Sequence, residues 1–327
     1  MIHSKVLFLA PIISALAQDL PADIVGCTDL DCPNEGWDSC TVAEETYAGV
    51  GLARVPNVPG SLNGISLVKG VHIEDPQSGG NAGGDGSEVS RSFRSVYYLG
   101  TPSNLEVGDL SGCAVVFNDP PTGHFDVPKL NDSITVDTRA SYGTCPDVIQ
   151  QGCIESLTRQ AGNVRYTGPS TCSALASDLR DNPPDECSDM TGSGDGLGSF
   201  DVISLGNLSI ISQSANGSSD CWPVLPKSDN LAQLHDDTTK GNYTEEGNLA
   251  EMYKITPILT VFTSNNSTNS LANNTSASMT CLKVVSTRNT TNTTDPTDTD
   301  VDAAPLSAVN MAGVSVAGLA TLMFVLL

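Results

Sequence analysis

The chain has 327 residues, ten of them cysteine, and its 38 acidic against 15 basic side chains give a formal net charge of −23 at pH 7. So acidic a surface argues against binding to nucleic acid or to anionic lipid head groups, because these carry the same sign of charge. The length is sufficient for a full hydrophobic core in one or two domains.

The first 17 residues have the layout of a secretory signal peptide. Lys5 precedes the apolar run VLFLAPIISALA, which ends in the small-residue pattern Ala15-Leu16-Ala17. Pro11 inside the run argues against the alternative, a buried N-terminal helix. We expect residues 1–17 to be removed, and the loss of Lys5 then makes the net charge −24.

Residues 18–286 are predicted to form the folded body. The sequence of the first half of this body predicts β structure. Residues 18–42, which contain CTDLDCPNEGWDSC, predict a small loop-rich knot pinned by disulfides. From Tyr47 to Asp137, short β-branched or aromatic runs are separated by breaks rich in Gly, Pro and Asn. These runs are SLNGISLVKGVHIE, SRSFRSVYYLG, CAVVFN and DSITVDT. The pattern is typical of antiparallel strands.

A helix is predicted from residue 144 to residue 162. Thr144 and Asp147 have the spacing of a capping box, Pro146 suits the first turn, and Gly162 can close the helix. Apolar residues recur at every fourth position on one face, namely Ile149, Cys153 and Leu157.

A second helix is predicted from the apolar positions that follow, which are Cys172, Leu175, Ala176 and Leu179. Asn182-Pro183-Pro184 ends it. Each helix thus carries a cysteine on its apolar face, which predicts a stapled helix pair with a Cys153–Cys172 disulfide. Cys145 and Cys187 then need other partners, and they can pair with each other. The alternative is that Cys153 and Cys172 pair with strand cysteines such as Cys113.

Strand patterns return after residue 200. DVISL and LSIIS flank Gly206-Asn207, which predicts a hairpin with a two-residue turn. YKITPILTVFT and SMTCLKVVST predict two further strands, and Pro257 indicates that the first of them lies at a sheet edge.

The C-terminal 41 residues divide into a stalk and a tail. Residues 287–302 read TRNTTNTTDPTDTDVD. This segment has too few apolar side chains to fold, which predicts a disordered, O-glycosylated stalk. Residues 303–327 are predicted to be a GPI-attachment signal with Asp302 as the attachment residue, because the small triplet Asp302-Ala303-Ala304 is followed by a short spacer and an uncharged apolar end. The alternative is a membrane-spanning helix, for which 17 apolar residues is a minimal length.

The cysteine count predicts five disulfides, because an even number in an exported chain reads as a disulfide framework. Zinc is the competing interpretation, but the chain has no C-x-x-C pair. The ten positions are Cys27, Cys32, Cys40, Cys113, Cys145, Cys153, Cys172, Cys187, Cys221 and Cys281.

Ten Asn-x-Ser/Thr sequons support the secretory interpretation and predict N-glycosylation. Six of them crowd into residues 265–292, beside the predicted stalk. The ten are Asn131, Asn207, Asn216, Asn242, Asn265, Asn266, Asn273, Asn274, Asn289 and Asn292.

The chain has no G-x-S-x-G, H-E-x-x-H or Walker motif. The glycine-rich residues 192–198 lie among acids that suggest a calcium loop, without the EF-hand spacing; the acids are Asp185, Asp189, Asp195 and Asp201. A flexible loop is the default interpretation. His72 with Glu74 and Asp75, and His124 with Asp126, suggest a metal site, although surface histidines beside acids are commoner.

A carbohydrate enzyme needs two facing carboxylates, and 38 acids do not single out a pair. Only Trp37 and Trp222 are available as tryptophan platforms for sugar stacking. No catalytic residue and no cofactor is therefore assigned.

The order of leader, cysteine-rich body, Thr/Asn-rich stalk and GPI-type tail resembles the surface glycoproteins of filamentous fungi. The stretch GTCPDVIQQGCIESLTRQAGN is similar to a cysteine-bearing helical segment of secreted fungal proteins. The resemblance implies a place in the cell wall or on the outer face of the plasma membrane and carries over no catalytic residue.

Taken together, the patterns predict an α+β protein with a β-rich antiparallel body and a stapled helix pair on a glycosylated stalk. The expected function is non-catalytic: a structural, adhesive or ligand-binding surface glycoprotein, held to the membrane by a lipid anchor, with cell-wall polysaccharide as a candidate partner and no nucleic acid. The alternative is a GPI-anchored hydrolase that acts on wall polysaccharide.

Overall fold

The computed structural model describes residues 25–26, 40–74, 90–102, 104–126, 129–131, 134–135, 141–164, 171–194, 196–211, 230–242, 245–263 and 275–284. By its internal contacts the chain divides into two units, Met1–Thr287 and Arg288–Leu327, and every described residue belongs to the first. The predicted leader, stalk and attachment signal lie outside the described residues.

Two antiparallel sheets form the body, as predicted. The larger has the order β1 (Val25–Gly26), β4 (Gly49–Arg54), β5 (Ser66–Ile73), β6 (Ser90–Thr101), β12 (Asn230–Asn242) and β11 (Ser209–Ile210). The smaller has the order β10 (Phe200–Ser204), β7 (Gly112–Phe117), β13 (Thr256–Phe262) and β14 (Ser276–Leu282). Two short hairpins join β2 (Cys40–Val42) to β3 (Glu45–Tyr47), and β8 (Lys129–Asn131) to β9 (Ile134–Thr135).

The helices are short and lie between the strands in sequence. The α-helices are α1 (Cys145–Val148), α2 (Gln151–Asn163), α3 (Thr171–Asp181) and α5 (Glu245–Met252). The 3₁₀-helices are η2 (Gly60–Leu62), η3 (Val107–Asp109), η5 (Asp185–Cys187) and η6 (Leu205–Asn207). Among the described helices, none is both long and apolar enough to cross a bilayer.

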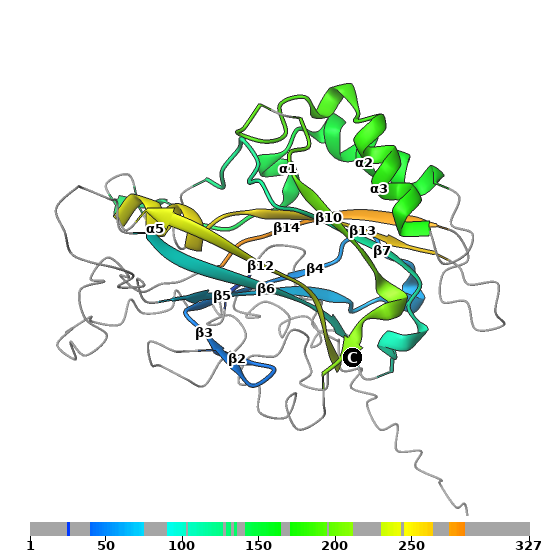
Figure 1. The fold of residues 1–327 in the computed structure, drawn as a ribbon, viewed down its shortest axis with the longest axis horizontal. Coiled ribbons are helices and arrows are strands. Elements are labelled where there is room, and N and C mark those ends of the chain that lie inside the picture. Colours follow the sequence, from blue (N-terminus) through cyan, green and yellow to red (C-terminus); the bar gives the residue numbers. More distant parts are fainter. Residues whose placement is uncertain are drawn as a thin grey trace, which may run out of the picture. The chain divides into compact units, whose positions relative to one another are not determined.

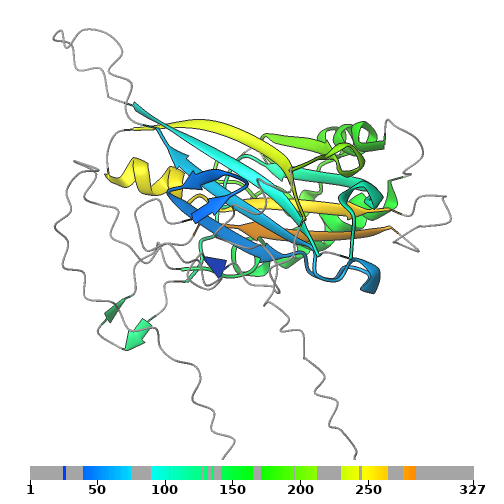
Figure 2. The same cartoon turned by 90° about the horizontal axis from the view of Figure 1, so that it is seen from below.

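The body is layered (Figure 1). Helices α1, α2 and α3 cover one face of the four-stranded sheet, whose other face packs on the six-stranded sheet, and the β2–β3 hairpin lies on the far side. Figure 2 shows this hairpin from below, crossing the larger sheet. The layers explain β13, in which all seven residues are buried, because a strand covered on both faces needs no polar side.

The β2–β3 hairpin contacts the larger sheet through Tyr47, whose side chain is fully buried. The ring lies directly on the backbone of β5, because a Cβ at Gly70 would fall 2.6–2.7 Å from three of its atoms. Glycine is therefore required at position 70 for the ring to approach the sheet so closely. The small apolar cluster around it also contains Val42, Val50, Leu52, Val68, Val96, Tyr98 and Leu231.

The helical segment begins as predicted but is interrupted. The backbone N–H and hydroxyl of Thr144 donate to Asp147 Oδ2 at 2.7 and 3.0 Å, so the capping box is confirmed. The helix stops at Ile149, whose backbone is extended, and restarts at Gln151. The break keeps the Ile149 side chain buried while the chain turns. The second predicted helix is confirmed as α3, which ends at Asp181, before the two prolines.

The predicted hairpin around Gly206-Asn207 is wrong. Strand β10 pairs with β7 in the smaller sheet, whereas β11 pairs with β12 in the larger one. A two-residue I′ turn needs positive φ at both central residues, and neither Gly206 nor Asn207 has it. The segment instead forms η6, which buries Leu205 and carries the chain from one sheet to the other.

The edge position predicted for the first of the late strands is also wrong, because β13 lies between β7 and β14. Pro257 is tolerated there because the ladder with β7 begins one residue later, at Ile258. The proline, which lacks an N–H, pairs only with Cys281 of β14.

Three disulfides join the described residues: Cys113–Cys172, Cys145–Cys281 and Cys153–Cys187. The predicted Cys153–Cys172 bridge is wrong, and so is the suggested pairing of Cys145 with Cys187. The alternative was right for Cys172, which bonds to strand β7. Both helical segments lie on the smaller sheet, so a cysteine in each reaches a strand beneath it: Cys172 of α3 reaches β7, and Cys145 of α1 reaches β14.

Cys27, Cys32 and Cys221, together with the side chain of Cys40, lie outside the described residues, so the prediction of five bridges stays open.

Candidate functional site

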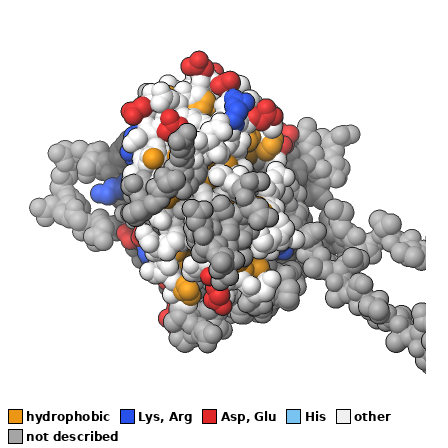
Figure 3. Space-filling view, turned by 90° about the vertical axis from the view of Figure 1, so that its right-hand side faces the viewer, with side chains coloured by type: hydrophobic (Ala, Val, Ile, Leu, Met, Phe, Trp, Pro, Cys, Tyr) orange, Lys and Arg blue, Asp and Glu red, His pale blue; other side chains and the backbone are white. Residues whose placement is uncertain are grey.

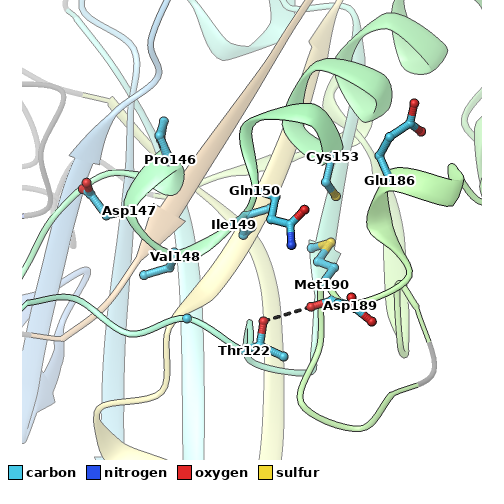
Figure 4. Close-up of a pocket in the computed structure, with 11 residues that line it drawn as sticks. Thr122, Pro146, Asp147, Val148, Ile149, Gln150, Cys153, Glu186, Asp189 and Met190 are labelled. Atoms are coloured by element: carbon cyan, nitrogen blue, oxygen red, sulfur yellow. Dashed lines mark hydrogen bonds between the residues drawn. The ribbon is translucent and has the colours of Figure 1, made fainter.

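A cavity of about 270 Å³ opens in the helical layer, between the α1–α2 junction, the loop after β7, and η5 (Figure 4). Eleven described residues line it: Thr122, Gly123, Pro146, Asp147, Val148, Ile149, Gln150, Cys153, Glu186, Asp189 and Met190. The volume is just below the range of about 300–1,000 Å³ that is usual for small-molecule sites.

The walls of this pocket are tied together on several sides. Cys153 of α2 is bonded to Cys187 of η5. On the opposite side, Thr122 donates its backbone N–H to Met190 O at 3.0 Å and its hydroxyl to Asp189 O at 2.9 Å. The pocket shape is therefore fixed by covalent and hydrogen bonds between segments that are distant in sequence.

The floor of the pocket is apolar. Val148, Ile149, Cys153 and Met190 are all at least 95% buried. The chain is also closely packed at Gly123, where a Cβ would fall 2.5 Å from the carbonyl oxygen of Val148. In Figure 4 the side-chain amide of Gln150 and the thioether of Met190 face the middle of the pocket. A polar ligand group can therefore hydrogen-bond at the mouth while an apolar group fills the floor.

Asp147, Glu186 and Asp189 are exposed at the rim, and none of the eleven described lining residues is Lys, Arg or His. Figure 4 shows the carboxylates of Asp147 and Glu186 on opposite sides, pointing away from one another. The helical layer as a whole is acidic, and Figure 3 shows red side chains gathered at the upper end of the molecule, where Figure 1 places α2 and α3. The pocket therefore lies in a region of negative potential.

A second constellation lies on the outer face of the larger sheet and is centred on Glu45. Its Oε2 accepts hydrogen bonds from the hydroxyl of Tyr47 at 3.0 Å, from Arg94 Nη1 at 3.1 Å and, at 3.2 Å, from His72 Nε2. The hydroxyl of Tyr47 also bonds to that of Tyr98. We call these five residues the Glu45 cluster.

Burial shifts the pKa of the two tyrosine hydroxyls in this cluster. It raises the pKa of Tyr98 to about 12, and the pKa of Tyr47 is raised further, by burial and by Tyr98 and Glu45 beside it. Both phenols are therefore neutral at pH 7. Because Glu45 belongs to the hairpin and its partners His72 and Arg94 belong to β5 and β6, the cluster clamps the hairpin onto the sheet.

Two lysines are buried between layers. Lys69 Nζ donates to Lys254 O at 2.7 Å and to Thr256 Oγ1 at 3.0 Å, and burial lowers its pKa well below the usual value. Lys283 Nζ donates to the carbonyl oxygen and hydroxyl of Ser141 at 2.7 and 2.9 Å, and burial lowers its pKa to about 8. Neither lysine lines the pocket, and each holds the backbone of another segment.

The histidines picked out in the sequence are not brought together as a metal site. His72 contacts Glu45, which lies 27 positions earlier, and His124 is exposed in the loop after β7. Within the described part of the chain, no group of three His, Cys, Asp or Glu side chains is placed to hold a metal ion.

The acids suggested for a calcium loop are spread out. Asp185 and Asp189 are exposed in and after η5, whereas Asp201 lies on β10 and accepts a hydrogen bond from Asn118. Asp195, Trp37 and Trp222 lie outside the described residues.

Of the predicted glycosylation sites, Asn207 is exposed on η6, so a glycan has room there. Asn131 ends β8 and Asn242 ends β12. The remaining seven sequons lie outside the described residues.

Sequence reasoning missed the pocket itself and every member of the Glu45 cluster except His72. The predicted helix with its capping box gave the local signal at one wall, and Asp189 was named only as a calcium candidate. The pocket as a whole was missed because its walls come from segments up to 68 positions apart. No protein-family model, curated protein or solved structure matches this chain. The resemblance to fungal surface glycoproteins therefore stays a prediction.

Proposed function

We propose that this chain is an exported, non-catalytic glycoprotein, displayed at the cell surface on a GPI anchor, which binds a small ligand in the pocket of its helical layer. The observation that carries the binding role is the pocket built between disulfide-bonded segments. A preformed site of this kind binds without the entropic penalty of ordering its own walls.

Export is supported by the three disulfides, since such bonds persist in oxidising compartments and are rare in the cytosol. Display on a lipid anchor is supported by the sequence of residues 303–327. A wall-bound or membrane-bound position follows from these two features together.

Binding is favoured over hydrolysis by the arrangement of the rim acids. Glycosidic hydrolysis uses two carboxylates that face the scissile bond from about 5 to 9.5 Å apart. Asp147 Oδ2 is engaged in the capping box, and its carboxylate points away from that of Glu186 in Figure 4. We therefore propose that the protein binds a ligand and does not hydrolyse polysaccharide.

The test is to fill the pocket. Gln150 is exposed and its side chain makes no capping bond, so Gln150→Trp can fold while its indole occupies the mouth. Gln151→Trp is the matched control, because Gln151 is exposed in the next position and does not line the pocket. Ligand-observed NMR with benzyl alcohol and similar neutral fragments on the secreted protein should show binding that Gln150→Trp abolishes and Gln151→Trp keeps. Equal binding by both variants would contradict the proposal.

A further inference from the structure

The rim of the pocket is negatively charged. Its floor is apolar, and all three of its charged lining residues are acids. One carboxylate oxygen of Asp147 accepts hydrogen bonds from Thr144. Glu186 and Asp189 make no ion pair among the described residues. The charge on the rim is therefore not neutralised by a neighbouring base that the structure describes.

Basic side chains are few in this layer. Between residues 141 and 194 the described bases are Arg159 and Arg180. The guanidinium of Arg159 donates to Ser156 at 2.9 Å, and that of Arg180 lies over the ring of Phe200 at 5.2 Å. Neither lines the pocket, so an anion entering it would meet the rim carboxylates and no basic side chain among the described residues.

From the shape and the charge together we infer that the pocket selects a small organic cation: a primary or substituted ammonium attached to an apolar body of roughly six to ten heavy atoms. This inference rests on the proposed binding function and specifies its ligand class. The apolar body occupies the floor at Ile149 and Met190. The ammonium stays at the mouth, where the Asp189 carboxylate, the Gln150 amide oxygen and the Thr122 hydroxyl can accept its hydrogen bonds.

The attraction is modest, because exposed carboxylates at a rim act through a high dielectric. We expect a cation to bind about threefold to fivefold more tightly than a neutral molecule of the same shape at low ionic strength. An anion of the same shape should bind more weakly still. The preference should shrink in 0.5 M salt, in which the screening length falls to about 4 Å.

The experiment titrates three probes of one size into the secreted protein at pH 7: benzylammonium, benzyl alcohol and benzoate. Wild type should bind them in that order. Glu186→Gln combined with Asp189→Asn should bring the affinities for benzylammonium and benzyl alcohol together. The matched control is Asp181→Asn with Asp185→Asn, which removes two exposed acids of the same layer that do not line the pocket and should keep the preference.

The outcomes separate the inference from the function on which it rests. If all three probes bind equally and Gln150→Trp abolishes their binding, the pocket is a site but the charge selectivity is overturned. Equal loss of preference in the rim double variant and in the control double variant also overturns it. If no probe binds, or if Gln150→Trp leaves binding unchanged, the proposed function itself fails.

Discussion

Lys283 should make the stability of the protein depend on pH in an unusual direction. Burial lowers its pKa from 10.5 to about 8 in the folded protein. Between these values the unfolded chain binds more protons than the folded one, so the free energy of unfolding rises as pH rises. At 1.36 kcal/mol per unit of pKa, the shift corresponds to about 3 kcal/mol, present in full above pH 10.5 and lost as pH falls through 8.

The perturbation that isolates this contribution is Lys283→Met. Near pH 7 the variant loses the hydrogen bonds to Ser141 but no longer buries an ammonium, so the two effects oppose one another. At pH 10 only wild type has gained stability from the loss of the Lys283 proton, because the variant has no amine at this position. The difference in unfolding free energy between wild type and variant should therefore grow by up to about 3 kcal/mol between pH 7 and pH 10.

Urea unfolding followed by circular dichroism at pH 7, 8, 9 and 10 measures this difference. Lys69 is shifted in the same direction, so the variant keeps part of the rise, and only the difference reports on Lys283. Tyr98 acts in the opposite sense, because stability from its raised pKa is present below pH 10 and lost as pH rises through about 12. Lys240→Met, at an exposed lysine, is the control. A difference that stays constant over the whole pH range would refute the buried position of the Lys283 ammonium.

Gly70→Ala should destabilise the protein by about 1–3 kcal/mol, because its Cβ would overlap a tyrosine ring of the β2–β3 hairpin, whereas Gly60→Ala has no atom within 4 Å of the new Cβ and should be nearly neutral. Thermal unfolding of the two variants compares them. Peptide mapping without reduction should recover Cys153 linked to Cys187, and a peptide linking Cys153 to any other cysteine would show the pairing to be wrong. A GPI-specific phospholipase should release the protein from intact cells; detergent-only extraction with residues 303–327 still attached would falsify the lipid anchor.

Local patterns predicted the strands and helices whose side chains are themselves regular. The β-branched run of β5 and the aromatic-rich β6 were recognisable, as was the capping box at Thr144. Strand β12 was not predicted, because NLAQLHDDTTKGN lacks β-formers along most of its length. It is a strand because it pairs with β6 from Asn230 to Asn242, and tertiary pairing outweighs intrinsic propensity.

Local sequence patterns could not predict the disulfide partners or the pocket, and the physical reason is the same for both. The prediction of Cys153–Cys172 assumed that two amphipathic helices bury their faces against each other. Instead, the strands of the smaller sheet offer a larger apolar surface, and α3 is bonded to β7 beneath it. Which segments become neighbours is decided by the stacking of layers, and no spacing along the chain encodes it.

The bond between Cys145 and Cys281 also has a mechanical consequence. Only Leu282, Lys283 and Val284 separate it from the end of the described body, and Lys283 is itself anchored to Ser141. Strand β14 is antiparallel to β13, so a pull on the chain beyond residue 284 would peel the two strands apart one pair at a time, starting at Leu282. That peeling reaches the covalent bond after a single pair. Tension then passes through the Cys145–Cys281 bond into α1 and the helical layer, so the pairs of β14 that precede Cys281 in sequence are shielded from the pull by a covalent bond.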